Sequence, residues 1–211
     1  MILEKFSCGP LDTNAVLLGC KASGSAAVID PSLGSTELIL EELAAQDLRL
    51  EKILLTHSHW DHIADVHELK TKTGAKISIH ALDAANLERP GSDGLPLFFP
   101  IHGEAPDSFL EEGQILEVGT LRIHVIHSPG HSPGSVCFYL PEQKLLFSGD
   151  TLFQGSIGTL HLPTAQPKNM WLSLKKLLAL PPDTRVVPGH GADTTLGEET
   201  WLPRAEELFS E

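Results

Sequence analysis

The chain has 211 residues, and 41% of them are hydrophobic, which is enough for a sizeable core in one globular domain covering residues 1–211. Its 15 basic and 28 acidic residues give a net charge of −13, which repels both phosphate backbones and anionic membrane surfaces. We therefore expect neither a nucleic-acid partner nor a membrane partner, and composition leaves the oligomeric state open.

Strands and helices alternate in the first half of the chain. Short apolar runs bounded by Gly, Ser and Pro at residues 14–20 and 26–29 predict buried strands. Ser35 is expected to cap a helix whose apolar face holds Leu38, Ile39, Leu43 and Ala44. The pattern then predicts a strand at 52–56, a helix at 63–72 that stops at Gly74, a strand at 75–80 and a short helix at 81–88.

The second half begins with residues 90–109, where Gly, Pro, Ser and Asp surround Leu97, Phe98 and Phe99. A loop of this length is usually functional or mobile, and its apolar side chains fit a pocket wall as well as core packing. The later elements predicted are two strands within 115–126 separated at Gly119, a hairpin at 136–147 that turns at Pro141-Glu142-Gln143, a helix at 170–180, a strand at 185–187 and a final helix at 198–209.

The densest group of chemically active side chains follows the strand predicted at 52–56. It is Thr56-His57-Ser58-His59-Trp60-Asp61-His62. Side chains two positions apart on an extended chain point the same way, so His57 and His59 can share one metal ion. Asp61 and His62 follow where the chain turns toward the next helix, and they can face a second ion. Imidazole and carboxylate ligands suit zinc, and also iron or manganese.

Three more ligand-type residues stand at the ends of other predicted strands. They are His131 in Pro129-Gly130-His131-Ser132-Pro133-Gly134-Ser135, Asp150 in Ser148-Gly149-Asp150-Thr151, and His190 in Val187-Pro188-Gly189-His190-Gly191. A single His or Asp in such a place is more often structural or solvated. All three together, in this order after the first cluster, indicate that separate strands converge on one metal site.

The order of these motifs, T-H-x-H-x-D-H, P-G-H-S-P-G-S, G-D-T-L-F and P-G-H-G, resembles that of the metallo-β-lactamase superfamily. The chain is most similar to the type II glyoxalase (hydroxyacylglutathione hydrolase) branch in its short single-domain form, from Thr13-Asn14 to about Gly191. The resemblance implies an α/β fold, a four-layer αββα sandwich with the metals at one edge of two sheets. It also implies that one metal is held by His57, His59 and His131, the other by Asp61, His62 and His190, and that Asp150 bridges them.

The predicted site would hold two divalent ions, expected to be zinc with iron or manganese as alternatives, and a two-metal site of this kind indicates a hydrolase. They lower the pKa of a shared water toward neutrality, and the resulting hydroxide attacks a carbonyl carbon that one metal polarises. Asp61 and Asp150 are expected to orient the hydroxide, and Asp61 to accept a proton as the intermediate collapses. We therefore expect an enzyme that hydrolyses a small-molecule thioester of the hydroxyacylglutathione type.

Two segments depart from the glyoxalase-like pattern. After Gly158 that pattern continues with Arg, Thr and Asp, whereas this chain has Thr159, Leu160 and His161. The missing Arg–carboxylate clamp indicates an altered pocket, in which His161 either contacts substrate or is a solvated loop residue. Residues 195–211 carry five Glu against the single Arg204, so this tail is not expected to anchor the carboxylates of a glutathione conjugate.

Other activities use the same types of ligand. A persulfide (sulfur) dioxygenase needs one iron, which His57, His131 and Asp150 could hold, while a lactone or phosphodiester hydrolase keeps the two-metal chemistry. The transfer-RNA-processing nucleases carry an RNA-gripping arm that this acidic chain lacks. A β-lactamase usually has Cys in place of Asp150, and flavodiiron oxygen reductases have Glu in place of His59. A non-catalytic binding protein on this fold is expected to lack one of the metal-ligating residues, and none of them is missing.

The sequence also bears on cellular location. The N-terminal residues lack the long apolar core of a signal peptide, and no apolar run approaches the roughly 20 residues that span a bilayer. Cys8, Cys20 and Cys137 stand at unrelated spacings, as expected for reduced thiols. These features predict a cytoplasmic protein.

Overall fold

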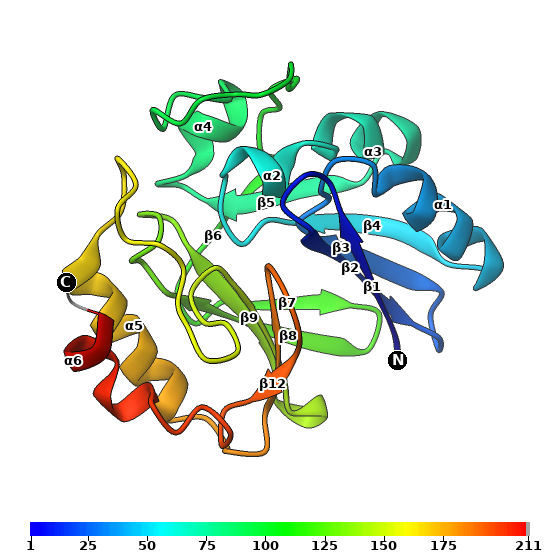
Figure 1. Ribbon diagram of the computed structural model, residues 1–211. Coiled ribbons are helices and arrows are strands. Elements are labelled where there is room, and N and C mark those ends of the chain that lie inside the picture. Colours follow the sequence, from blue (N-terminus) through cyan, green and yellow to red (C-terminus); the bar gives the residue numbers. More distant parts are fainter. Residues whose placement is uncertain (210–211) are drawn as a thin grey trace.

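Two six-stranded β-sheets form the centre of the structure, a computed structural model that describes residues 1–209 (Figure 1). The first sheet holds strands β1 to β6 in chain order, and the second has the order β12-β11-β10-β9-β8-β7. Helices α1 and α3 cover the outer face of the first sheet, and α5 and α6 cover that of the second. The expected αββα sandwich is therefore confirmed.

The first sheet is antiparallel at its start and parallel afterwards. Its strands are β1 (Ile2–Cys8), β2 (Thr13–Cys20), β3 (Ser25–Ile29), β4 (Arg49–Leu54), β5 (Lys76–His80) and β6 (Ser108–Leu110). The pairs β3–β4, β4–β5 and β5–β6 are parallel, so these strands end at the same edge. The sequence did not predict β1 or β6, because β1 is a partly exposed edge strand and β6 has only three residues.

The second sheet is antiparallel except for one pair. Its strands are β7 (Ile115–Val118), β8 (Leu121–His127), β9 (Val136–Leu140), β10 (Leu145–Gly149), β11 (Arg185–Pro188) and β12 (Thr194–Thr195). The predicted turn at Pro141–Gln143 is a 3₁₀ turn between β9 and β10, which confirms the hairpin. Strands β10 and β11 are parallel, so both reach the same edge of the sheet.

Three apolar clusters lie between the four layers. The central one joins the two sheets through fully buried side chains such as Leu18, Phe138 and Phe147. A second packs the outer face of the first sheet against α1 and α3, and a third packs the second sheet against α5. Each sheet is thus buried on both faces, which explains why β2, β3, β9 and β10 consist almost entirely of apolar residues.

The helices are α1 (Thr36–Ala45), α2 (Trp60–Ile63), α3 (Val66–Thr73), α4 (Ala84–Glu88), α5 (Pro167–Leu178) and α6 (Ala205–Phe209), with a 3₁₀ turn at Leu202–Arg204 before α6. The helix predicted at 63–72 is two helices, but it ends as predicted at Gly74, which has a φ of 73°. The helix predicted at 198–209 begins only at Leu202. None of the helices within residues 1–209 is long and apolar enough to cross a membrane.

The start of α1 differs from the sequence prediction. Ser35 occupies the N-cap position, but its side chain makes no capping hydrogen bond. The carboxylate of Asp65 accepts hydrogen bonds from the backbone N and the hydroxyl of Thr36 instead, both at 3.0 Å. Of the predicted apolar face, Ile39 and Leu43 are buried, whereas Leu38 and Ala44 are exposed. The cap therefore comes from a residue 29 positions away, which local pattern does not reveal.

Candidate functional site

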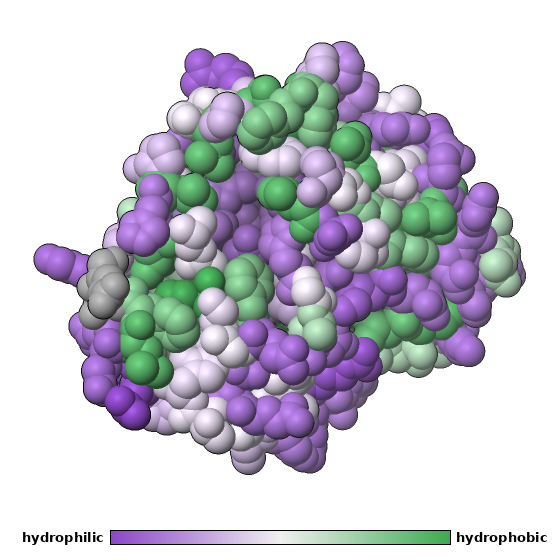
Figure 2. Space-filling model, viewed as in Figure 1, coloured by the Kyte–Doolittle hydropathy of each residue, from purple (hydrophilic) through white to green (hydrophobic). Residues whose placement is uncertain are grey.

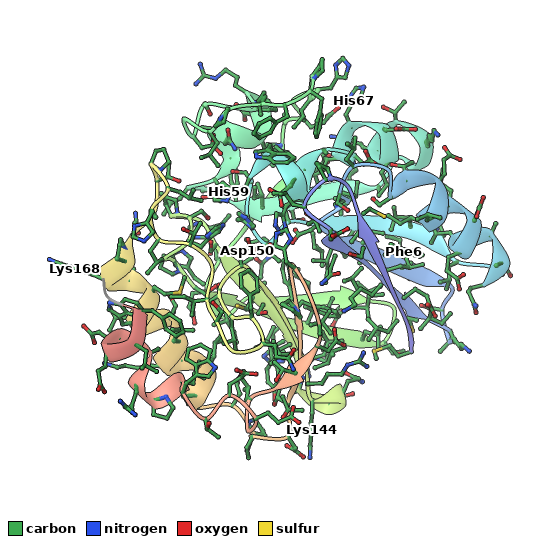
Figure 3. All side chains as sticks on the ribbon, viewed as in Figure 1. Phe6, His59, His67, Lys144, Asp150 and Lys168 are labelled. Carbon is green, nitrogen blue, oxygen red and sulfur yellow. The ribbon has the colours of Figure 1, made fainter. Side chains whose placement is uncertain are left out.

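Seven of the predicted side chains converge at one edge of the two sheets. His57, His59, Asp61 and His62 follow β4, while the other three follow β8, β10 and β11. His59 and Asp150, which come from different sheets, lie together near the middle of Figure 3. All seven are buried except His190, which is partly buried.

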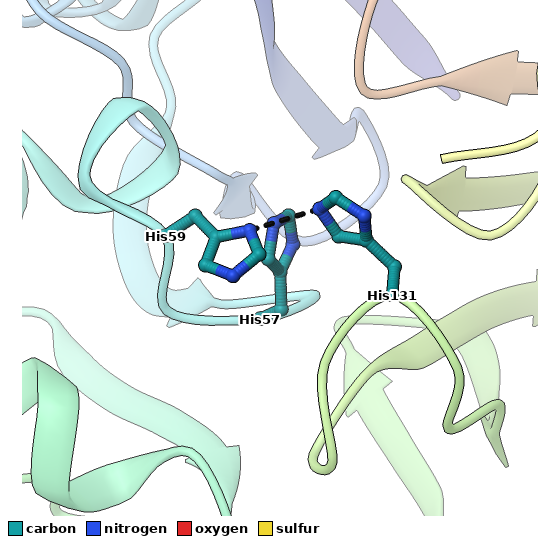
Figure 4. A group of neighbouring side chains, drawn as sticks. All are labelled: His57, His59 and His131. Atoms are coloured by element: carbon teal, nitrogen blue, oxygen red, sulfur yellow. Dashed lines mark hydrogen bonds between the residues drawn. The ribbon is translucent and has the colours of Figure 1, made fainter. Parts of the chain in front are cut away.

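The first group within this cluster consists of three imidazoles (Figure 4). His57 and His59 come from the loop after β4, and His131 comes from the loop after β8. One ring nitrogen from each lies within 4.8 Å of the others. Nδ1 of His59 lies 2.8 Å from Nε2 of His131, and the ring centroid of His57 lies 4.6 Å from that of His59.

The second group consists of Asp61, His62 and His190. Oδ2 of Asp61 lies 3.3 Å from Nε2 of His62 and 3.2 Å from Nε2 of His190. The two Nε2 atoms are themselves 3.3 Å apart. Three potential ligand atoms from two distant parts of the chain therefore face one another.

Asp150 lies between the two groups. Its Oδ2 is 3.3 Å from Nε2 of His131, and its Oδ1 is 3.4 Å from Nε2 of His62. Oδ2 is also 3.5 Å from Nε2 of His190. One carboxylate therefore contacts a member of each group, which is the arrangement that a bridging role requires.

Two glycines allow this close packing. Gly149, just before Asp150, has a φ of 48°, and a Cβ there would lie 2.5 Å from Oγ1 of Thr56. A Cβ at Gly189 would lie 2.3 Å from Oδ1 of Asp150. Only residues without a side chain let β10 and β11 bring Asp150 and His190 this close to His62.

Asp30, which the sequence analysis did not single out, holds one histidine of each group in position. Its Oδ2 accepts a hydrogen bond from Nδ1 of His62 at 2.9 Å, and its two oxygens accept from the backbone N and the hydroxyl of Thr56. Because that hydroxyl donates to Asp30, it accepts from Nδ1 of His57, 3.1 Å away. Asp30 directly follows β3, the parallel neighbour of β4. An acidic residue immediately after a buried strand was the sequence signal that could have identified it as part of the site.

Backbone carbonyls fix two further imidazoles in the same way. Nδ1 of His131 donates to the carbonyl oxygen of Thr159, and Nδ1 of His190 donates to that of Leu11, each at 3.0 Å. With Nδ1 engaged outward, Nε2 faces the cluster in His131 and His190, as it does in His57 and His62. A hydrogen bond that fixes the outer nitrogen is the usual support for a metal-binding histidine.

Two more supporting residues were missed. Oγ1 of Thr13 donates to Oδ2 of Asp61 at 2.9 Å. The buried carboxylate of Asp83 accepts from the backbone N of Ser58 at 3.1 Å, from the hydroxyl of Ser132 at 2.7 Å and from the backbone N of Gly134 at 2.6 Å. Asp83 thereby joins the loop that carries His57 and His59 to the loop that carries His131.

The cluster also fits a further, positively charged group. Nε2 of His57 and Oδ1 of Asp150, both of which face the cluster, are buried and have no hydrogen-bond partner within residues 1–209. A buried polar atom left without a partner costs about 1–3 kcal/mol, so such atoms are rarely left unused. Nitrogen and carboxylate oxygen donors converging in this number are typical of sites for divalent transition metals.

The imidazoles of the cluster fall into two classes, those with a lowered pKa and those with a raised pKa. Burial, together with the neighbouring imidazoles, lowers the pKa of His59 to about 3 and holds that of His57 well below its usual range. Burial also disfavours charge on His190, but hydrogen bonds to Asp150 and Asp61 outweigh it and raise its pKa to about 9. The pKa of His62 is likewise raised well above its usual range, because Asp61, Asp150 and Asp30 outweigh the effect of burial.

The carboxylates show the reverse effect. Burial opposes ionisation of Asp61, but His62 and His190 outweigh it and lower its pKa to about 2. The pKa of Asp150 also lies well below its usual range, because His62, His190 and His131 outweigh its burial. Both carboxylates are therefore ionised at neutral pH and stabilise positive charge beside them.

A cavity of about 350 Å³ opens onto the cluster. Its other walls are formed by Leu11, Trp60, Leu95, Pro96, Phe98, Thr159 and Leu162. Trp60 contacts Phe98 and Phe99 edge to face, with ring centroids 5.4 and 5.5 Å apart. The loop of residues 90–109 therefore supplies part of the cavity wall, one of the two roles considered for it. A larger cavity, of about 420 Å³, lies between α5 and α6 and touches none of the seven residues.

His161 does not line this cavity. Its side chain is exposed, although the nearby Thr159 and Leu162 are both part of the wall. Of the segment that departs from the glyoxalase-like pattern, Thr159 lines the cavity, Leu160 packs against the apolar cluster under α5, and His161 lies in solvent.

Residues 8–190 match the metallo-beta-lactamase superfamily. An uncharacterized protein of Aquifex aeolicus is 34% identical over the whole of both chains. The hydroxyacylglutathione hydrolase GloC of Haemophilus influenzae is 36% identical over 83% of this chain and 84% of its own length. A hydroxyacylglutathione hydrolase of Cereibacter sphaeroides is 38% identical over 85% of this chain, which spans only 62% of that relative.

Solved structures show the same architecture. The B3 metallo-beta-lactamase BLEG-1 superposes with a TM-score of 0.86 and is 36% identical, covering 94% of this chain and 96% of its own. TTHA1623, solved in a di-iron-bound form, has a TM-score of 0.80 and 41% identity over 93% of this chain and 96% of its own.

Proposed function

Because this chain belongs to the metallo-β-lactamase superfamily, we propose that it is a hydrolase of small-molecule thioesters of the hydroxyacylglutathione type. The observation that carries the proposal is the convergence of five imidazoles and two carboxylates, of which His59, His131, His190 and both carboxylates line one cavity. Relatives that are named hydroxyacylglutathione hydrolases, at 36% and 38% identity, support the thioester as substrate.

We assign the two groups to two divalent cations. One cation would be held by His57, His59 and His131, and the other by Asp61, His62 and His190. Asp150 would bind both cations. Zinc suits these ligands, and iron or manganese are the alternatives. Cations bound there would supply a water acidic enough to ionise near neutral pH and an electrophile for the carbonyl oxygen.

The chain's own residues would orient the reacting groups. The ionised Asp61 and Asp150 would hold a water between them as acceptors, and Thr13 keeps Asp61 in place through its hydroxyl. As the C–S bond of the tetrahedral intermediate breaks, Asp61 would take the hydroxyl proton of that intermediate on a carboxylate oxygen and pass it to the departing sulfur, so that a carboxylate and a thiol are released. The apolar wall formed by Trp60 and Phe98 would exclude bulk water from that step.

The test is a substrate screen combined with metal analysis. Protein loaded with zinc is expected to bind about two ions per chain and to release free thiol from hydroxyacylglutathione thioesters. Stringent chelation should abolish thiol release, and zinc should restore it. Lactones, phosphodiesters, β-lactams and persulfides are screened in parallel. Protein that stays metal-free and inert after reconstitution would contradict the proposal.

A persulfide dioxygenase is the second candidate. Oδ2 of Asp150 lies 3.3 Å from Nε2 of His131, and the rings of His57 and His131 are 5.0 Å apart, so these three residues could hold one iron. Oxygen uptake with glutathione persulfide, together with a single tightly bound iron, would favour this function over thioester hydrolysis.

Cation binding should depend on pH in a defined direction. In the metal-free protein His190 has a pKa of about 9 and His62 one well above the usual range, so both carry protons near neutral pH. Cations bind only the neutral imidazole, so zinc must displace these protons, and its affinity should rise as the pH increases toward about 9. Calorimetric titration in two buffers of different ionisation enthalpy measures the protons released. A His102→Ala control removes an exposed histidine and should leave that number unchanged, and zinc binding without proton release would contradict this expectation.

A further inference from the structure

We propose that the cavity beside the cluster selects thioesters that are uncharged and apolar, and that the carboxylates of glutathione contribute nothing to binding. The inference rests on the proposed function for the reaction but concerns which molecules bind. It follows from the chemistry of the cavity wall and from the positions of the basic side chains.

The wall outside the cluster is almost entirely apolar. Leu11, Trp60, Leu95, Pro96, Phe98 and Leu162 form it, and Thr159 is the one polar residue among them. Pockets of this kind bind through apolar contact and use few polar groups to fix orientation. Here the polar groups are the cluster itself at the floor, which addresses the thioester carbonyl and leaves the rest of the ligand to the apolar wall.

No lysine or arginine lines this cavity within the part of the chain that the structure describes. Nine of the 15 basic residues form ion pairs with acidic residues elsewhere on the surface. Lys144 and Lys168, labelled in Figure 3, both point outward, away from Asp150. With a net charge of −13 the protein also repels anions over a longer range. A glutathione carboxylate therefore finds no partner at the cavity wall.

The rim of the cavity exposes apolar surface that a ligand would cover. Phe98 packs on Trp60 and is 72% exposed, and Leu11 is 50% exposed. In Figure 2 a hollow with a hydrophilic floor lies near the middle of this face, and hydrophobic residues gather above it, where Figure 1 places α4 and the loop that follows. An apolar group leaving the hollow would rest on this surface and be stabilised by its burial.

Thioethers test the inference because they contain no acyl–sulfur bond that the protein could hydrolyse during the measurement. The affinities of zinc-loaded protein for S-octyl-glutathione and S-octyl-N-acetylcysteamine are compared by calorimetry. The second ligand has the same alkyl chain but no charge. We expect it to bind at least as tightly as the first. Binding of the glutathione thioether about tenfold tighter or more, or no detectable binding of either ligand, would overturn the inference.

Matched variants locate the contact. Phe98→Ala should weaken binding of the neutral thioether about fivefold, as expected for losing one aromatic contact. Phe109→Ala removes a phenylalanine that is 52% exposed and outside the cavity, and it should have no effect. Leu162→Arg adds a cation to the wall and should shift the preference toward the glutathione thioether. Equal affinities in Phe98→Ala and the unchanged protein would overturn the assignment of the wall.

The two proposals fail separately. If the neutral thioether binds with the expected preference but no thioester is hydrolysed, the cavity assignment holds and the proposed reaction is wrong. If glutathione thioesters are hydrolysed and their thioethers bind much more tightly than neutral ones, the reaction holds and the inference about the cavity is wrong.

Discussion

An Asp150→Ala variant is expected to lose thioester hydrolysis by a factor on the order of a thousand, a loss as large as that from removing a principal transition-state contact. Asp150 contacts His131 with one oxygen and His62 with the other, and it also contacts His190. Asp61 contacts only the second group, and Asp30 accepts from Nδ1 of His62 and reaches His57 through the hydroxyl of Thr56, so neither presents an oxygen to the Nε2 atoms of both groups. Alanine would leave the two proposed cations without a shared ligand and would remove an acceptor for the attacking water.

The measurements are kcat/KM, bound metal and thermal unfolding of the same preparation. The control is Asp183→Ala, which removes an exposed carboxylate that pairs with Lys144 far from the cluster, and which should leave kcat/KM unchanged. Asp150→Ala protein that unfolds near the temperature of the unchanged protein but keeps more than about a tenth of its activity would refute the bridging role.

An Asp30→Asn variant is expected to bind zinc about 10–100-fold more weakly, the usual effect of losing a group that orients metal ligands. The carboxylate of Asp30 accepts three hydrogen bonds, from the backbone N and hydroxyl of Thr56 and from Nδ1 of His62. The amide of asparagine has only one oxygen, so one side now presents N–H to a donor. His62 loses its support directly, and His57 loses it through Thr56.

Asparagine is the informative substitution because Asp30 has a φ of 49°, a left-handed conformation that asparagine also adopts readily. Asp47→Asn is the matched control, since Asp47 has a φ of 52° but is exposed and remote from the cluster. Competition with a chromophoric chelator measures zinc affinity in both variants. Equal affinities would show that His62 and His57 keep their orientation without the carboxylate.

The sequence located the cluster because its chemistry is local to strand ends. His57 to His62 follow a buried parallel strand, and the Gly-rich turns around His131, Asp150 and His190 mark other ends. The structure brings all seven side chains together at that edge. That they hold metal ions stays a proposal, and the metal measurements above test it.

The supporting contacts could not be predicted in the same way. Asp30 reaches Thr56 across 26 residues, Thr13 reaches Asp61 across 48, and Asp83 reaches Ser132 across 49. Each is an ordinary polar residue in its own segment, and only the packing of the sheets gives it a partner. The same limit explains why Asp65 was missed as the cap of α1, since its partner Thr36 lies 29 residues away.

Short elements were also beyond the pattern. Strand β12 has two residues and β6 has three, too few for alternation to show. The sequence of the loop at residues 90–109 does not distinguish core packing from a pocket wall, because an apolar side chain fits both equally well. The structure resolves it residue by residue: Leu95, Pro96 and Phe98 line the cavity, while Ile101 packs against the core of the first sheet.

The hydrogen bonds of Asp83 determine which parts of the site can adapt. They join the loop from one sheet to the loop from the other, and so hold the two halves of the cavity floor together. The cavity wall at Leu95 to Phe98 and at Leu162 comes from segments that these hydrogen bonds do not join. Substitutions in those two segments would therefore change which molecules the cavity accepts without breaking the contacts that hold its floor.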